Sequence, residues 1–230
     1  MTHDDRASAI DIAEPAVALL PAQDGGAGGS LLDCLRQVRS ALGRERAEAP
    51  ALAAELLALA PERREERLLG ESRFQTWGLC ELLVARSVEA EDDPAAAGGL
   101  AALAIVAADR LARAHPPSVV ADLKARAWAA AGEARRRQGD LAAAEEALRA
   151  AAGCLAEGTG DLLVEARLLE FEAAVRRQQG RTGEAAALLK QAAARYRQTG
   201  EARRMERALA ERDEVLRRAG AGTAPGRPPV

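Results

Sequence analysis

Aromatic side chains are almost missing from this chain of 230 residues: Phe, Trp and Tyr together make up 2% of it. Hydrophobic residues nevertheless reach 48%, so the apolar side chains are mainly those of Ala and Leu. Ala and Leu lose little side-chain entropy in a helix, whereas sheets favour β-branched and aromatic residues. The shortage of aromatics therefore argues against a β-rich fold and predicts an all-α protein.

Lysine is equally scarce, since Lys124 and Lys190 are the only two and nearly all basic residues are Arg. The formal net charge is −3, so the chain offers no global positive field to attract DNA or RNA. The sequence also lacks a helix-turn-helix pattern with a basic reading face. We therefore expect no nucleic-acid partner.

Cysteine and histidine are too few for a disulfide framework or a histidine metal site. The 3 Cys are an odd number, widely spaced in helical sequence, which favours a reducing compartment. His3 and His115 lie too far apart in the pattern to ligate a metal together. The Gly-rich stretch "GGAGGS" lacks the Gly-Lys-Ser/Thr ending of a phosphate loop. These absences predict no cofactor, no metal site and no enzymatic activity.

Long hydrophobic runs are lacking as well. No stretch approaches the roughly 20 apolar residues that a membrane span needs. The apolar part of "MTHDDRASAIDIAEPAVALLPAQDGGAGGS" is too short and too broken for a signal peptide. The sequence therefore predicts a cytoplasmic protein without a membrane partner.

Glycine and proline divide the chain into four parts. Residues 1–29 end in "QDGGAGGS" and are expected to form a flexible arm. Residues 30–71 are expected to form an N-terminal helical segment. Residues 72–218 carry the most regular helical pattern, and the Pro/Gly-rich residues 219–230 are expected to form a flexible tail.

The regular part of the chain predicts a succession of helices. Asp93 and Pro94 pair a good N-cap with a first-turn proline, and Pro50 and Pro61 are expected to begin two earlier helices in the same way. Short turns between helices favour antiparallel pairs. The helices expected after the N-terminal segment span residues 72–87, 94–114, 118–138, 141–156, 162–179, 183–199 and 201–218.

Two stretches of this regular part resemble each other. "QGDLAAAEEALRAAA" aligns with "QGRTGEAAALLKQAA", so that Gly139 matches Gly180 at an offset of 41 residues. Both glycines can adopt positive φ and end a helix. Gly132 and Ala144 place minimal side chains where two paired helices would cross, which permits an axial separation of about 8–10 Å. The spacing predicts stacked antiparallel helix pairs.

On these residues the sequence resembles the tetratricopeptide repeat (TPR) family, whose 34-residue unit is a helix–turn–helix. Ala131 and Arg135 depart from the Leu and Tyr of the family pattern. The resemblance is strongest over residues 122–199 and implies an α-solenoid closed by a C-terminal capping helix. The residues that match the family in order and spacing are Trp128, Gly132, Ala144, Leu148 and Ala151.

The resemblance also implies a binding groove, since the first helix of each pair lines one in this family. The implied face is rich in Arg, whose guanidinium group binds carboxylates in bidentate fashion, so the expected ligand is an acidic protein or peptide segment. The alternative is a solvated helix face. The family's clamp for a C-terminal carboxylate is excluded, because Ala129 and Glu133 replace its Lys and Asn. The candidate partner-binding residues are Arg126, Glu133, Arg136, Arg137, Arg167, Glu170, Arg177 and Gln178.

Three functions are compatible with this pattern. The leading hypothesis is a non-enzymatic scaffold or adaptor that binds a partner protein or peptide. The alternatives are a regulatory sensor that responds to a peptide or small ligand, and a self-assembling structural helical protein. The sequence leaves open whether the protein forms a homo-oligomer.

Overall fold

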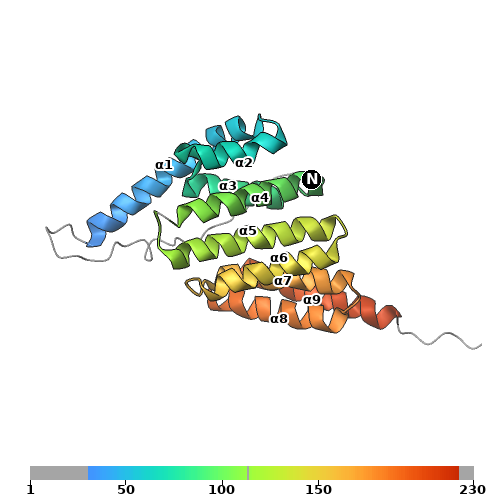
Figure 1. Cartoon of the computed structure of the whole chain (residues 1–230). Coiled ribbons are helices and arrows are strands. Elements are labelled where there is room, and N and C mark those ends of the chain that lie inside the picture. The colour runs from blue at the N-terminus through green and yellow to red at the C-terminus, as the bar shows by residue number, and fades with distance from the viewer. Residues whose placement is uncertain (1–30, 113, 223–230) are drawn as a thin grey trace, which may run out of the picture.

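The computed structural model describes residues 31–112 and 114–222 (Figure 1). All regular structure in this part of the chain is helical, which confirms the prediction from composition. The expected flexible arm at 1–29 lies outside the described residues, as do residues 223–230 of the expected tail. The elements are α1 (Leu31–Leu57), α2 (Pro61–Gly70), the 3-10 helix η2 (Ser72–Phe74), α3 (Trp77–Glu89), α4 (Pro94–Leu111), α5 (Pro117–Arg137), α6 (Leu141–Ala156), α7 (Leu162–Gln178), α8 (Thr182–Gln198) and α9 (Ala202–Gly222).

The helices stack in the order in which they follow along the chain. From α4 to α9, each helix packs against the one before it, and the stack runs from α1 and α2 at one end to α8 and α9 at the other (Figure 1). Helix α5 also contacts α3 and α7, the second helix before it and the second helix after it. The fold is therefore an all-α, solenoid-like stack of neighbouring helix pairs.

Three of the connections between helices have the same geometry. Gly139, Gly180 and Gly200 adopt φ values of 85°, 77° and 79°, which a residue with a side chain rarely tolerates. In each turn the next residue donates its N–H to the carbonyl five positions back, as in the bond of 3.0 Å from Asp140 to Arg135. This is the Schellman motif, and it satisfies the last carbonyl groups of each helix. The turn glycines predicted at 139 and 180 are confirmed.

Small residues let the paired helices approach closely, as the spacing predicts. Ala144 and Ala185 are fully buried, and Ala173 is 1% exposed. At Gly132 an added Cβ would lie 2.9 Å from Cδ2 of Leu148 and 3.3 Å from the carbonyl oxygen of Ala144. Helices α5 and α6 therefore touch at a position that has no room for a methyl group.

Trp128 joins two parts of the core. It packs against the cluster that α1 to α5 form and also against the cluster that includes Leu148 and Phe171. A large ring can reach both groups because α5 lies between the earlier and the later helix pairs. The core therefore continues from the N-terminal helices into the repeats.

The connection from α6 to α7 is longer than the turns at Gly139, Gly180 and Gly200 and is held by a buried carboxylate. Asp122 of α5 accepts hydrogen bonds from the backbone N–H of Thr159 at 3.2 Å and from its hydroxyl at 2.5 Å. Burial raises the pKa of the Asp122 carboxyl, which the hydrogen bonds from Thr159 only partly oppose. Gly158 is required here, because a Cβ would lie 2.0 Å from Oδ1 of Asp122. The connection between α6 and α7 is thus packed against α5.

The N-terminal segment differs from its prediction. Pro50 does not begin a helix but lies inside α1, whereas Pro61 begins α2 as predicted. A proline inside a helix removes one hydrogen bond and costs about 3 kcal/mol. Leu42, Ala53 and Leu56 continue one buried helical stripe on both sides of Pro50, and their burial offsets this cost. The segment therefore contains two helices where the prolines predict three.

Several helix ends also differ from prediction. The helix expected from residue 72 begins at Trp77, because the side chain of Thr76 caps it by accepting from the N–H of Leu79 at 3.2 Å. Helix α4 ends at Leu111, not at residue 114. Helix α9 continues to Gly222, so residues 219–222 are helical and do not belong to the predicted tail.

The N-terminal helices are integral to the stack. Helix α1 packs against α3, and α2 packs against α4. At Gly78 of α3, an added Cβ would lie 2.5 Å from the backbone C and O of Glu45 in α1. Helices α1 and α3 therefore approach each other so closely at Gly78 that no side chain fits between their backbones.

Helix α4 is the one described helix that is long and apolar enough to cross a membrane by length and composition. Its mean hydropathy is 1.3 over 18 residues, of which 39% are buried. In this structure α4 packs against α2, α3 and α5. Core helices of water-soluble proteins also satisfy these criteria of length and composition.

Candidate functional site

Six of the eight candidate residues lie on a row of charged and polar side chains that crosses the odd-numbered helices. Contacts link α1 to α3, α3 to α5, α5 to α7 and α7 to α9. We call this set the ion-pair row. Its members are Arg46, Glu81, Arg126, Glu133, Arg136, Arg137, Arg177, Gln178 and Glu211.

The N-terminal part of the row is centred on Glu81 of α3, which is only 5% exposed. Its Oε2 accepts from Nε of Arg46 at 2.8 Å. On the other side, Nη1 of Arg126 lies 4.0 Å from Oε1 of Glu81. Arg126, a predicted ligand-binding residue, therefore faces a carboxylate of its own chain.

Glu133 is the centre of the next part, about two helical turns further along α5. It accepts from Nε and Nη2 of Arg136 at 2.7 and 2.8 Å, and from Nε of Arg137 at 2.9 Å. Burial opposes ionisation of Glu133, but the hydrogen bonds and charges of the two guanidinium groups together lower its pKa. Glu133 is thus a charged anchor for two of the predicted Arg residues.

Two contacts carry the row on to α7 and α9. Nη1 of Arg136 donates to Oε1 of Gln178 at 3.0 Å. Nη1 of Arg177 donates to Oε1 of Glu211 at 3.1 Å. The structure therefore places five of the predicted residues at the C-terminal ends of α5 and α7: Glu133, Arg136, Arg137, Arg177 and Gln178.

The remaining predicted pair lies between α7 and α8, apart from the row. Nη1 of Arg167 donates to Oε2 of Glu170 at 3.0 Å, and its guanidinium carbon lies 4.9 Å from the centre of the Phe171 ring. The hydroxyl of Tyr196 also donates to Oε2 of Glu170, at 2.9 Å. Burial, together with the charge of Glu170, raises the pKa of Tyr196, so the phenol stays protonated. Arg167 and Glu170 thus belong to a contact with α8.

Each predicted Arg has a carboxylate partner inside the molecule. A ligand carboxylate must therefore compete with Glu81, Glu133, Glu170 or Glu211. The side chains of Arg167 and Arg177 are 43% exposed, whereas that of Arg126 is 17% exposed. The two exposed guanidinium groups are the ones that an incoming ligand can reach.

Sequence reasoning missed two carboxylates of the row, Glu81 and Glu211. Glu211 lies 34 residues after its partner Arg177, which equals the repeat length of the family that the sequence resembles. A search of the sequence for an acidic residue 34 positions after Arg177 finds Glu211. Glu81 lies in a part of the chain where the repeat spacing is lost, so no comparable signal points to it.

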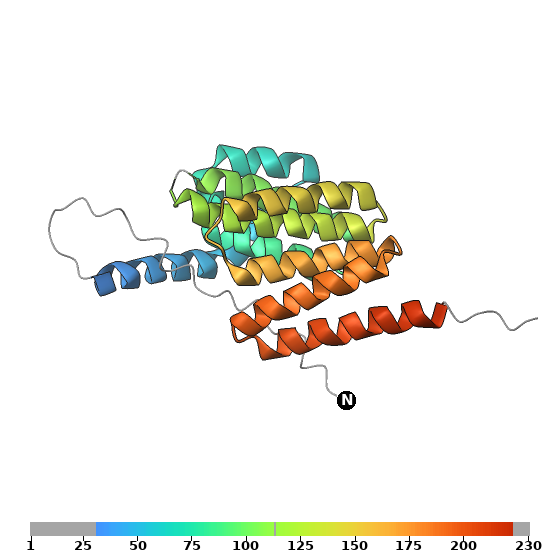
Figure 2. The same cartoon turned by 90° about the horizontal axis from the view of Figure 1, so that it is seen from below.

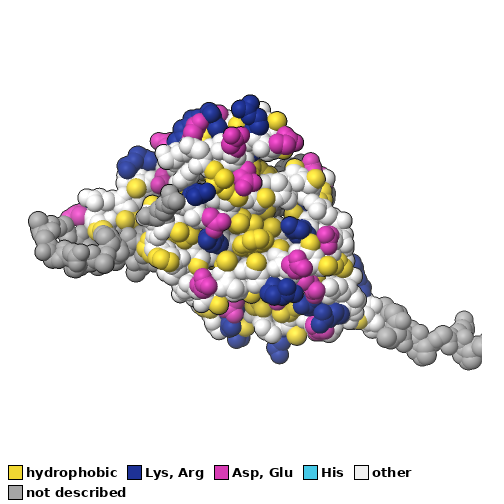
Figure 3. Space-filling view, in the orientation of Figure 1, with side chains coloured by type: hydrophobic (Ala, Val, Ile, Leu, Met, Phe, Trp, Pro, Cys, Tyr) yellow, Lys and Arg dark blue, Asp and Glu magenta, His cyan; other side chains and the backbone are white. Residues whose placement is uncertain are grey.

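Charges of both signs are mixed on the surface. Figure 3 shows Lys and Arg interspersed with Asp and Glu around hydrophobic side chains in the middle of the face. Five Arg and three Glu of the ion-pair row leave it a net charge of +2. A surface of this kind recognises a ligand by short-range contacts, because opposite charges cancel each other at a distance.

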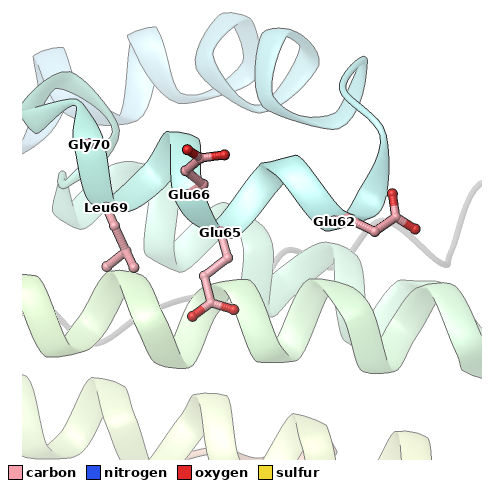
Figure 4. Close-up of a pocket in the computed structure, with 5 residues that line it drawn as sticks. All are labelled: Glu62, Glu65, Glu66, Leu69 and Gly70. Atoms are coloured by element: carbon pink, nitrogen blue, oxygen red, sulfur yellow. The ribbon is translucent and has the colours of Figure 1, made fainter.

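Helix α2 carries a shallow depression of about 520 Å³, lined by Glu62, Glu65, Glu66, Leu69 and Gly70. Glu65 and Leu69 point towards α4, and the other two carboxylates point elsewhere (Figure 4). Within residues 31–112 and 114–222, no three His, Cys, Asp or Glu side chains are grouped so that they could hold a metal ion. The depression therefore offers an acidic surface and no metal centre.

Comparison of the chain with protein-family models, with curated proteins and with solved structures finds no match. The class that the fold itself defines is an all-α, solenoid-like helical protein.

Proposed function

We propose that the protein is a non-enzymatic scaffold or adaptor of the TPR type, which binds a partner protein or peptide along the ion-pair row in the cytoplasm. The observation that supports this is that polar side-chain contacts of the row link α1 to α3, α3 to α5, α5 to α7 and α7 to α9. A surface that crosses five stacked helices can follow an extended chain segment. Repeat proteins use such elongated surfaces for binding.

The ligand chemistry that fits best is an acidic segment. The net positive charge of the row favours carboxylates, and Arg177 of the row presents an exposed guanidinium group for bidentate contacts. An exposed ion pair contributes only about 0.2–1 kcal/mol, so one contact does not hold a partner. Several carboxylates along the segment are needed to give useful affinity.

The test uses a fluorescently labelled 12-residue peptide of alternating Glu and Ala, with Gln/Ala and Lys/Ala peptides of the same length. We expect the Glu peptide alone to raise the anisotropy, with a Kd that weakens at high salt. The double variant Arg136→Gln with Arg177→Gln, two residues of the row, is expected to weaken binding at least tenfold. The matched control is Arg149→Gln with Arg197→Gln, two exposed residues of α6 and α8.

Two outcomes contradict this proposal. Equal binding of the Glu and Gln peptides shows that charge does not select the ligand. Equal loss of affinity in the variant and in the control shows that general surface charge, and not the site, is responsible. Circular dichroism of both variants checks that each keeps its helical content.

A further inference from the structure

Charges of opposite sign lie on opposite sides of α2. At roughly 100° per residue, its three Glu side chains fall on one side of the helix and its three Arg side chains on the other. Nη1 of Arg67 lies 2.6 Å from Oε1 of Glu71, and Nε of Arg64 donates to the carbonyl oxygen of Leu59 at 2.9 Å. The three Glu side chains are exposed, and none of them makes an ion pair with a described residue. We call them the acidic side of α2; they are Glu62, Glu65 and Glu66.

The outward side of α4 is apolar. Helix α4 carries no charged side chain before Asp109. Ala95, Gly99 and Ala102 are exposed and follow one another at helical spacing, and the half-buried Val106 continues them. A Cβ added to Gly99 would meet nothing within 4 Å, so this side of α4 faces open space. A helix face in contact with water normally carries charged and polar side chains, so this apolar face is available to a partner.

The acidic side of α2 and the outward side of α4 are neighbours. Helix α2 packs against α4, and Glu65 and Leu69 of α2 point towards α4 (Figure 4). Leu69 is half-buried and also lines the depression of about 520 Å³ on α2. An apolar surface with an acidic edge therefore adjoins the depression. We call the acidic side of α2 and the outward side of α4 together the α2–α4 face.

The chemistry of the α2–α4 face suits a basic amphipathic helix. Ala95, Gly99 and Ala102 have minimal side chains, so the axis of a second helix can approach that of α4 to about 8–10 Å. Basic side chains four residues apart on such a helix recur at a rise of about 6 Å, which equals the rise from Glu62 to Glu66. The carboxylates attract a basic partner and repel an acidic one.

Charge distinguishes this occupant from two others. A bilayer with anionic lipids is repelled by the three carboxylates, although α4 by itself is apolar and long enough for a membrane. A second copy docked through the same face brings the carboxylates of both copies into one interface, which like-charge repulsion opposes. A helix with Lys or Arg along one edge of its apolar side meets neither difficulty.

We propose that the α2–α4 face binds a basic amphipathic helix of a partner protein. The apolar side of that helix packs on α4, and its Lys or Arg side chains pair with Glu62, Glu65 and Glu66. Figure 2 shows α2 on the opposite side of the molecule from α9, the helix that ends the ion-pair row. The inference therefore goes beyond the proposed binding of an acidic segment and does not depend on it. With both surfaces, one chain holds an acidic partner and a basic one.

The probe is a fluorescently labelled 18-residue peptide helix of Leu, Ala and Lys, with the Lys side chains along one edge of the Leu side. A second peptide has the same composition in shuffled order and forms no apolar side, and a third has Glu in place of Lys. We expect the ordered Lys peptide to raise the anisotropy with a Kd at least tenfold lower than that of either control peptide.

The acidic side is tested by the removal of its charges. Binding of the ordered Lys peptide is expected to weaken at least tenfold in the triple variant Glu62→Gln, Glu65→Gln, Glu66→Gln. The matched control removes three other exposed carboxylates and is expected to change the Kd less than threefold; it is Glu146→Gln, Glu157→Gln, Glu206→Gln.

The apolar side is tested without a change of charge. Ala102→Gln places a longer polar side chain on the outward side of α4 and is expected to weaken binding at least fivefold. Its control is Ala152→Gln at an exposed position of α6, which is expected to change the Kd less than twofold. Circular dichroism of every variant checks that each keeps its helical content.

Four outcomes overturn the proposal. Equal binding of the ordered and shuffled Lys peptides shows that charge alone attracts them. Equal losses in the triple variant and its control show that total charge, and not the acidic side of α2, is responsible. Binding to vesicles of phosphatidylcholine and phosphatidylglycerol that Ala102→Gln abolishes identifies a membrane as the occupant. A doubled mass in analytical ultracentrifugation that Ala102→Gln returns to that of one chain identifies a second copy.

Discussion

Gly132 of α5 lies directly against Leu148 of α6, so close that a Cβ on the glycine would meet Cδ2 and Cγ of the leucine at 2.9 Å. Leu148 is 3% exposed and has little space into which it can retreat. The contact fixes the separation of the two helices at the centre of the best-matching repeat.

The substitution Gly132→Ala is expected to lower the free energy of unfolding by about 1–3 kcal/mol, the usual cost of overpacking a core. Chemical denaturation followed by circular dichroism measures it. Gly99→Ala is the control, since Gly99 lies in α4 with nothing within 4 Å of an added Cβ. There the better helix propensity of Ala is expected to raise stability by about 0.5–1 kcal/mol. A stable Gly132→Ala variant contradicts the close packing of α5 and α6.

The substitution Gly78→Ala is expected to cost more than Gly132→Ala, because its Cβ would meet the backbone of Glu45, which cannot rotate away. We expect α1 to separate from α3, so that limited proteolysis cleaves within α1 before the rest of the stack. Gly43→Ala, in α1 with nothing within 4 Å, is the control. Equal proteolysis of both variants shows that the contact between α1 and α3 is not tight.

Glu133→Gln removes the charge that Arg136 and Arg137 share and leaves two guanidinium groups without their carboxylate. We expect a loss of about 1–3 kcal/mol at pH 7. Because the pKa of Glu133 is lowered in the folded protein, its contribution is present above the ordinary value of 4.5 and is lost as the pH falls below it. Unfolding curves of parent and variant are therefore expected to converge in acid. Glu146→Gln, an exposed residue of α6, serves as the control.

Asp122 is expected to show the opposite pH dependence. Burial raises its pKa above the ordinary value of 3.8, so the folded chain holds the proton more tightly than the unfolded chain. The parent is then expected to lose stability as the pH rises from 3.8 through the raised pKa. Asp122→Asn keeps an acceptor for Thr159 without this titration. Its stability relative to the parent is expected to rise with pH over that range, and a flat difference contradicts the raised pKa.

Local spacing was enough to predict much of the fold. The turn at Gly139 and the contact of Gly132 with α6 depend on residues within one helix pair, and the alignment of two similar stretches shows both. Asp93 with Pro94 likewise predicts the start of α4, where the Asp93 side chain accepts from the N–H of Ala96 at 2.9 Å. These features can be predicted without knowing which distant residues pack against them.

The features that the sequence did not predict depend on long-range contacts. Pro50 remains inside α1 because residues on both sides of it pack against the same core. The partner of Arg46 is Glu81, 35 residues away on another helix. The sequence therefore predicted the Arg-rich face with Glu133 and Glu170, but not Glu81 and Glu211, the two partner carboxylates on other helices. The Arg residues on one helix face can be counted from the sequence, whereas the carboxylates that pair with them depend on how the helices stack.

The three turns at Gly139, Gly180 and Gly200 share one backbone conformation, so each is a joint of the same kind between two helices. Each ends its helix with the same bond and starts the next helix after the same interval. Two helices, α6 and α7, lie between the turns at Gly139 and Gly180, so recombination between these two turns adds or removes one whole helix pair without requiring a new turn. The α6–α7 connection is not one of these joints, because Asp122 and Thr159 bind it to a particular neighbour.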